Sequence, residues 1–255
     1  MIFETHAHYD DEQFDLDRDQ LLGSMQKGGV GTIVNVGASL ASSRASVSLA
    51  ERYPFIYAAV GVHPDHAGEM DEDGLRELRG LCGGDKVVAV GEIGLDYYWD
   101  EAPRDVQKEW FVRQLELARE MSLPVIIHSR DAAADTLEIM QSHARGLMGV
   151  IHCFSYSKEL AREYVKMGFF IGVGGVVTFK NGRRLKEVVE DIPLSSIVLE
   201  TDCPYLAPVP NRGKRNSSLN LPYVVREIAE IKGISCEEVM AQTEKNAKIL
   251  YGMRD

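Results

Sequence analysis

The sequence predicts an α/β protein, a TIM-type (β/α)8 barrel that forms a single domain from residue 1 to residue 255. Two observations predict this fold. Short apolar segments rich in Val and Ile recur eight times, and each is followed by a segment with helical periodicity. Strands of this kind, interleaved with helices, are typical of a parallel sheet with a covered outer face. The length fits as well, because such barrels take about 250 residues.

The predicted strands and helices alternate along the whole chain. The first strand is segment 2–8, and the seven later strands lie within "GTIVNVG", "FIYAAVGVHP", "KVVAVGEIGLD", "PVIIHSRD", "LMGVIHCFS", "GFFIGVGG" and "SIVLETDCP". The predicted helices cover residues 17–26, 39–52, 71–82, 104–121, 132–144, 157–167, 181–189 and 221–232. An extra C-terminal helix pair, from Ser235 onward, would cap or extend the barrel.

Composition restricts the classes of partner and the compartment. The chain has 28 Lys and Arg against 39 Asp and Glu, a net charge of −11, so a polyanionic substrate would need a local basic patch. Its four cysteines show no C-x-x-C spacing, which favours reduced thiols. Neither a long apolar run nor a signal peptide is recognisable. We therefore expect a cytoplasmic protein with no membrane association and no obligatory protein partner.

Residues that commonly bind metal ions stand at the carboxyl ends of six predicted strands. On the first strand, His6 and His8 share one face because side chains alternate with period two. The other five are His63, Glu92, His128, His152 and Asp202. For any one histidine an ordinary structural role is the better interpretation. Active sites of these barrels lie at this rim, however, so six converging strand ends favour a metal centre.

The donor set has the composition of a two-metal site. Four histidines and two carboxylates could hold two divalent cations, with one carboxylate bridging them. Glu92, between Gly91 and Gly94, is the candidate for the bridging ligand. Glu4 and Glu200 lie on the same strand faces as His6 and Asp202, one step deeper, and we expect them to accept the second ring N–H of a ligating histidine.

Several motifs resemble those of the TatD family of metal-dependent deoxyribonucleases. They are "ETHAHYD", "GVHPD", "GEIGLDYY", "PVIIHSRDA", "HCFS", "GFFIGVGGVVTFK", "LETDCPYLAP", "RGKRN" and "NAKILYG", in the order in which that family shows them. The resemblance runs over essentially the whole chain. It implies a TIM-type barrel, two divalent cations and hydrolysis of DNA phosphodiesters. It also implies metal-ligand roles for His6, His8, Glu92, His128, His152 and Asp202, with Glu92 shared between the ions.

The chain departs from the family pattern at a few positions. Glu4 stands where the family often has Asp, and Asp65 where many members have His. Ser217 and Ser218 replace a common Glu-Pro pair after "RGKRN". The last two departures concern substrate binding and leave the expected metal ligands intact.

Basic and aromatic residues near the expected rim predict contacts with nucleic acid. The loops after the seventh and eighth strands commonly form the phosphate site of this fold, and here they carry Lys180, Arg183, Arg184, Arg212, Lys214 and Arg215. Arg130 shares the face of His128 and could also meet an anion. Tyr97, Tyr98 and Trp99 could stack on an unpaired base or simply pack on the barrel rim. We predict Arg130, Arg212, Lys214, Arg215 and Tyr97 as substrate-binding residues and single-stranded DNA ends as the substrate, because no duplex-reading motif is evident.

For catalysis, we predict roles for Asp202, His63 and Glu92. Asp202 would hold the attacking water and accept its proton, and His63 would contact the scissile phosphate or protonate the leaving oxygen. Glu92 would bridge the cations, which we expect to be Mg, Mn or Zn.

Two alternatives remain open. One is an amidohydrolase that acts on a small amide or ester, although many such enzymes bridge their metals with a modified lysine where this chain has Glu92. The other is a binding protein that keeps its metal for stability.

Overall fold

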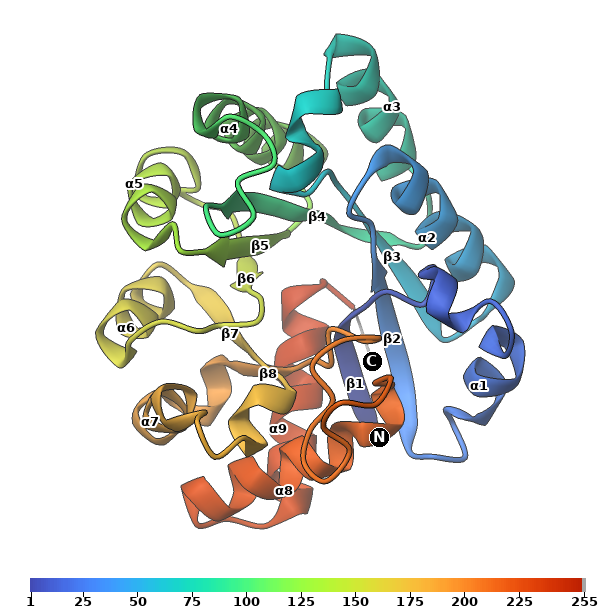
Figure 1. Ribbon diagram of the computed structural model, residues 1–255, viewed down its shortest axis with the longest axis vertical. Helices are drawn as coiled ribbons and strands as arrows, with labels where there is room; N and C mark the ends of the chain where they lie inside the picture. Colours follow the sequence, from blue (N-terminus) through green and yellow to red (C-terminus); the bar gives the residue numbers. More distant parts are fainter. Residues whose placement is uncertain (254–255) are drawn as a thin grey trace. The chain divides into compact units, whose positions relative to one another are not determined.

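The computed structural model describes residues 1–253, and in them strands and helices alternate in chain order (Figure 1). The strands are β1 (Ile2–Ala7), β2 (Val30–Val36), β3 (Ile56–Val60), β4 (Val87–Asp96), β5 (Val125–Arg130), β6 (Gly149–Ile151), β7 (Phe169–Val173) and β8 (Ile197–Leu199). The helices are α1 (Arg18–Ser24), α2 (Leu40–Arg52), α3 (Glu72–Cys82), α4 (Arg104–Met121), α5 (Ala133–His143), α6 (Lys158–Lys166), α7 (Arg183–Asp191), α8 (Leu221–Lys232) and α9 (Cys236–Leu250). Short 3-10 helices include η1 (Glu12–Phe14), η2 (Pro64–Glu69), η3 (Gly175–Thr178), η4 (Leu194–Ser196) and η5 (Ser218–Asn220).

The strand order identifies the fold class. Strands β1 to β8 follow one another in the sheet in chain order, and the pairings between them are parallel. A parallel bridge between Ala7 and Cys203 brings the chain after β8 back beside β1. The prediction of a TIM-type (β/α)8 fold is confirmed.

The predicted C-terminal helix pair from Ser235 onward is wrong, because this segment forms the single helix α9. Ser235 caps its first turn: the serine hydroxyl accepts from the N–H of Glu238, whose carboxylate accepts from the N–H of Ser235. The helix then runs to Leu250 because neither Gly nor Pro interrupts it.

By internal contacts the chain divides into two compact units, so the single domain over residues 1–255 stays a prediction. Unit 1 comprises Met1–Asn35 and His152–Asp255, and unit 2 comprises Val36–Ile151. In the described part of both units, no helix is long and apolar enough to span a membrane.

Unit 1 contains β1, β7, β8 and most of β2. Helix α9 packs against β1 and β8 (Figure 1), and its C-terminal end is anchored by Tyr251. The Tyr251 ring stacks on Phe3 with centroids 6.0 Å apart, and its hydroxyl donates to the carbonyl of Thr5 at 2.8 Å. These contacts support the strand that carries His6.

Unit 2 contains β3 to β6, with helices α2 to α5 along them. Strands β4 and β5 approach closely because two glycines of β4 lack side chains. A Cβ on Gly91 would lie 2.6 Å from the Cβ of Ile126, and one on Gly94 would lie 1.9 Å from the carbonyl oxygen of His128. Gly94 also has φ +146°, which only glycine adopts readily. This close approach sets Glu92 beside His128.

Candidate metal centre

The first cluster of predicted ligands lies in unit 1, where the chain after β8 runs beside the end of β1. The N–H of Asp202 donates to the carbonyl of His6 at 3.0 Å, and the N–H of His8 donates to the carbonyl of Cys203 at 2.9 Å. His152, which follows β6, joins them: its ring stacks on that of His6 with centroids 3.9 Å apart.

The donor atoms of this cluster are close enough to share one ion. One ligand atom from each of His6, His152 and Asp202 lies within 4.8 Å of the others. The Nε2 atom of His8 is 3.1 Å from Nε2 of His6 and 3.3 Å from Oδ1 of Asp202. Asp202 has φ 58°, a left-handed conformation that costs a non-glycine residue on the order of 1 kcal/mol or more and is enriched at functional sites.

The histidines keep the Asp202 carboxylate ionised. Burial alone would raise the pKa of Asp202, but the hydrogen bond with His8 and the charges of His152 and His6 hold this pKa below its usual value. An ionised carboxylate suits both a metal ligand and a proton acceptor.

Two further carboxylates are buried behind this cluster. Burial raises the pKa of Glu4 to about 7 and that of Glu200 to about 8, against opposing hydrogen bonds and charges. Neither of these two carboxylates makes the expected hydrogen bond with the ring N–H of a candidate histidine ligand. Glu4 accepts from the backbone N–H of His6 and from the N–H and hydroxyl of Thr201. Glu200 accepts from the N–H of Cys153 and comes no nearer than 3.9 Å to Nδ1 of His152.

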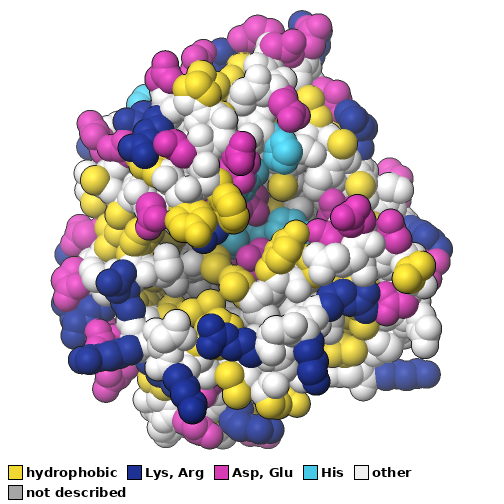
Figure 2. Space-filling model, in the orientation of Figure 1, with side chains coloured by type: hydrophobic (Ala, Val, Ile, Leu, Met, Phe, Trp, Pro, Cys, Tyr) yellow, Lys and Arg dark blue, Asp and Glu magenta, His cyan; other side chains and the backbone are white. Residues whose placement is uncertain are grey.

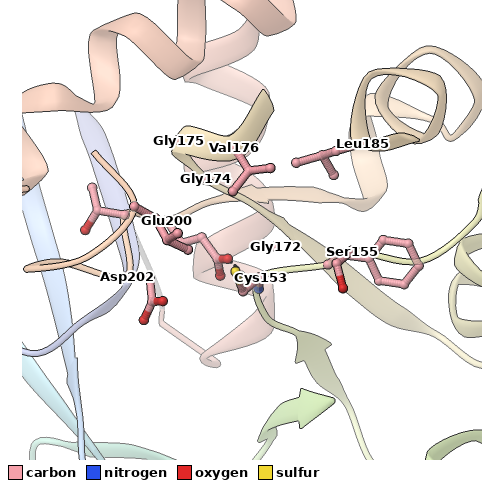
Figure 3. Close-up of a pocket in the computed structure, with 12 residues that line it drawn as sticks. Cys153, Ser155, Gly172, Gly174, Gly175, Val176, Leu185, Glu200 and Asp202 are labelled. Atoms are coloured by element: carbon pink, nitrogen blue, oxygen red, sulfur yellow. Dashed lines mark hydrogen bonds between the residues drawn. The ribbon is translucent and has the colours of Figure 1, made fainter. Parts of the chain in front are cut away.

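A small cavity of about 50 Å3 lies beside Asp202 in unit 1. Its wall includes Gly172 of β7 and the two glycines that follow this strand, and Figure 3 shows Gly172, Gly174 and Gly175 around it with Glu200 next to Cys153. A Cβ on Gly172 would come within 2.3 Å of Oε2 of Glu200, so only glycine leaves room for this carboxylate. The cavity is large enough for ordered water near the candidate ligand.

The second cluster lies in unit 2, at the carboxyl ends of β3, β4 and β5. Donor atoms of His63, Glu92 and His128 lie within 4.8 Å of one another. Oε1 of Glu92 is 2.9 Å from Nδ1 of His128 and 3.4 Å from Nε2 of His63. Glu92 is held at this position by its N–H, which donates to the carbonyl of Gly37 at 2.9 Å.

Asp96 belongs to the same cluster, although it is not among the residues predicted from the sequence. Its Oδ2 atom lies 3.0 Å from Nε2 of His128, and Asp96 also groups with His63 and Asp65. Burial would lower the pKa of His128, but its hydrogen bonds to Asp96 and Glu92 raise this pKa to about 9. Asp96 lies four residues after Glu92 on β4, so the period of two that selects Glu92 could also have found it.

Both clusters fit a divalent metal ion by the chemistry of their donors. Each combines imidazole nitrogens with at least one carboxylate, the set that Zn and related transition metals prefer. The structure brings together His6, His8, His152 and Asp202 in unit 1, and His63, Glu92 and His128 in unit 2. The role of Glu92 as a ligand shared by two ions stays a prediction.

The predicted basic residues of unit 1 are exposed, but they differ in their contacts. Figure 2 shows Lys and Arg side chains over α7 and over the loop that precedes α8. Arg215 forms a bidentate ion pair with Asp17 and lies over the ring of Phe14. Arg212 lies over the ring of Phe179, at 4.3 Å from its centroid, and keeps its charge at the surface beside Lys214. Arg212 and Lys214 are thus more available to a ligand than Arg215.

The aromatic residues after β4 also differ from one another. The hydroxyl of Tyr97 donates to Asp135 at 2.6 Å, and its ring carries the guanidinium of Arg104 at 4.2 Å. Tyr98 and Trp99, by contrast, are exposed. Arg130, at the end of β5, lies over Tyr98.

Residues 3–252 match the family model described as "TatD related DNase". Curated relatives include the "Uncharacterized metal-dependent hydrolase YabD" of Bacillus subtilis, which is 45% identical over 98% of this chain and 99% of its own length. The "3'-5' ssDNA/RNA exonuclease TatD" of Cronobacter sakazakii is 34% identical over 98% of this chain and 97% of its own.

Solved structures show the same fold. The crystal structure of YJJV, a TatD homolog from Escherichia coli, superposes with a TM-score of 0.93 at 31% identity, covering 99% of this chain and 98% of that one. An uncharacterized amidohydrolase from Saccharomyces cerevisiae superposes with a TM-score of 0.87 at 19% identity over 98% of this chain and 99% of that one, a likeness of fold alone.

Proposed function

The chain belongs to the family of TatD-related DNases, and from this premise we propose that it is a metal-dependent hydrolase that cleaves nucleic-acid phosphodiester bonds from single-stranded ends. The observation that carries the proposal is the pair of histidine and carboxylate clusters at the carboxyl ends of the strands. We propose two divalent cations, Mg, Mn or Zn, as the cofactors.

The ligand roles follow from the two clusters. His6, His8, His152 and Asp202 would hold one ion, and Glu92 and His128 another, with Glu92 as the proposed shared ligand. When bound, such ions act as Lewis acids on a phosphoryl oxygen and lower the pKa of water.

Two side chains are suited to move protons. An Oδ atom of Asp202 would accept a proton from the attacking water, because the neighbouring histidines keep this carboxylate ionised. Nε2 of His63, next to Glu92, would donate a proton to the leaving oxygen or contact the scissile phosphate.

Nucleic acid is the substrate that the surface favours. Arg212 and Lys214 are exposed on a chain of net charge −11, so they supply the local basic patch that a polyanion needs. The name of the Cronobacter relative, which specifies single-stranded DNA and RNA, supports unpaired ends of either polymer. A cytoplasmic location and independence from a protein partner are proposed from the sequence.

The amidohydrolase alternative receives no support from the lysine near β4. The ammonium of Lys86 donates to the carbonyls of Ala50 and Tyr53, at the amino end of β4. It is therefore at the opposite end of the strand from Glu92 and cannot serve as the bridging group of such an enzyme.

The test is a digest of end-labelled oligonucleotides, resolved by mass, with Mg, Mn, Co or Zn. Single-stranded DNA and RNA, duplex DNA, and a panel of lactones and amides would be compared for wild type and Asp202→Asn. Glu163→Gln, an acid-to-amide change at the exposed partner of Lys166, serves as the control. We expect wild type and E163Q to shorten single strands and D202N to be at least about a hundredfold slower. Uncut oligonucleotides with all four metals would refute the proposal, and turnover of a lactone or amide alone would favour the alternative.

A further inference from the structure

The loop between β4 and α4 presents two large aromatic side chains to solvent. Tyr98 is 55% exposed and Trp99 is 57% exposed, and their rings meet edge to face with centroids 5.1 Å apart. Hydrophobic side chains gather over the ends of β4 and β5 in Figure 2, with a basic side chain among them. Adjoining exposed aromatic side chains can mark a recognition site.

This exposure does not reflect a loosely attached loop. Oδ1 of Asp96 accepts from the N–H of Tyr98 at 2.8 Å and from the N–H of Trp99 at 2.9 Å. The buried Gln107 side chain bonds both the N–H and the carbonyl of Asp96, and also the carbonyl of Ala102. Hydrogen bonds therefore hold the loop at both Asp96 and Ala102, while its aromatic rings face the solvent.

A cation completes the aromatic surface. The guanidinium carbon of Arg130 lies 3.9 Å from the ring centroid of Tyr98 and 5.7 Å from that of Trp99. Asp100, an acidic residue of the same loop, pairs with Arg104 and not with Arg130. A planar guanidinium beside two rings can stack on a base and attract its phosphate.

The surface is also linked to the second metal cluster through one side chain. While Oδ1 of Asp96 holds the loop, Oδ2 of the same carboxylate lies 3.0 Å from Nε2 of His128. The backbone of the loop that carries the rings is thus bonded, through Asp96, to a candidate ligand of unit 2.

We propose that Tyr98, Trp99 and Arg130 form a stacking platform for an unpaired nucleobase of the substrate, next to the bond that is cleaved. The platform rests on the proposed function, because it assumes a nucleic-acid substrate. Stacking is insensitive to base identity, so the platform would accept single strands of any sequence and reject paired ends.

The first test measures binding separately from hydrolysis. Single-stranded oligonucleotides with a terminal 2-aminopurine would be titrated into chelator-treated wild type, Trp99→Ala, Tyr98→Ala and Arg130→Lys. Met148→Ala, an exposed apolar residue just before the amino end of β6, is the matched control. We expect quenching of 2-aminopurine with wild type and M148A, and binding about 5- to 100-fold weaker for W99A and Y98A. R130K keeps the charge but not the planar group, and should weaken binding less.

A second test uses turnover of oligonucleotides whose terminal nucleotide is abasic. For wild type, the abasic strand should have a higher KM than the intact strand, with kcat nearly unchanged. The factor should equal the increase in KM that W99A shows on the intact strand. For W99A, loss of the base should have no further effect. The platform would be overturned if W99A and loss of the base raised KM independently and additively. It would also be overturned if binding and 2-aminopurine quenching were unchanged in W99A and Y98A. Concentration-dependent dimerisation that W99A abolishes would overturn it too, by showing a second copy as the occupant. If no oligonucleotide is cut but the binding differences persist, hydrolysis fails and the platform stands.

Discussion

Asp96 serves the second metal cluster and the neighbouring loop with the same carboxylate. One oxygen accepts from the amides of Tyr98 and Trp99, and the other bonds the ring of His128. Groups that bond a metal-ligating histidine fix its orientation and raise its basicity. At the scale of single residues, Asp96 is therefore a positioning residue for the cluster of unit 2.

We predict that Asp96→Asn weakens metal binding at this cluster by about 10- to 100-fold. Asparagine keeps an oxygen for the loop amides, but it replaces the second oxygen by an amide nitrogen and removes a negative charge. The affinity would be measured by competition with a chromogenic chelator. Asp105→Asn, an exposed change on α4, is the control and should behave as wild type. Equal affinities in D96N and wild type would contradict the assigned role.

The residues of the candidate site were predictable to different degrees. His6, His8 and Asp202 could be identified because strand periodicity and the rim of the fold dictate where such side chains meet. The sequence identified Arg215 as a basic residue of the expected rim. It did not predict the ion pair with Asp17, which joins residues 198 positions apart in the chain. Ion pairs of that kind depend on tertiary packing, about which local pattern carries no information.

At the scale of elements, the closeness of β4 and β5 determines the geometry around Glu92. Gly94 has φ +146°, and its missing Cβ leaves the space taken by the carbonyl of His128. The apolar residues of this segment predicted the strand β4. They did not predict that β4 and β5 would come into contact at Gly94.

Gly94→Ala should therefore lower the free energy of unfolding by at least roughly 1–3 kcal/mol, the usual cost of backbone strain. Steric overlap with β5 would add to it. Gly80→Ala, on α3 with nothing within 4 Å of the added carbon, is the matched control and should stabilise by about 0.4–1 kcal/mol. Urea unfolding of both variants gives the comparison. A G94A variant as stable as G80A would show that β4 and β5 are not in this close contact.

The loop before α8 allows a test of the basic surface as an element. Replacing both Arg212 and Lys214 by Ala should weaken binding of single-stranded oligonucleotides and reduce its salt dependence. The slope of log K against log salt is negative, and it becomes less steep by about 0.7 for each phosphate that a side chain no longer neutralises. Fluorescence anisotropy across a salt series measures this slope. Arg76→Ala, an exposed change on α3, should leave the slope unchanged, and an unaltered slope in the double variant would exclude this loop from phosphate binding.

At the scale of the whole molecule, the alternation of eight strands and helices was readable from sequence, because covered parallel strands are apolar throughout. The division into two compact units was not readable, since no change of composition marks Asn35 or His152. Each unit nevertheless contains its own cluster of imidazoles and carboxylates.

This arrangement predicts how metal content responds to single substitutions. Wild type should bind two equivalents of Mn or Zn. Asp202→Asn in unit 1 and His128→Ala in unit 2 should each retain about one, because each removes a donor from one cluster only. The metal content of Glu92→Gln should be lower than that of D202N or H128A if Glu92 is shared by both ions, since a bridging carboxylate stabilises the binding of each ion. Mass spectrometry of metal after dialysis, with Glu163→Gln as the control, gives the counts. Two equivalents retained by E92Q would refute the shared ligand, and loss of both ions in D202N and H128A would show that the clusters do not bind independently.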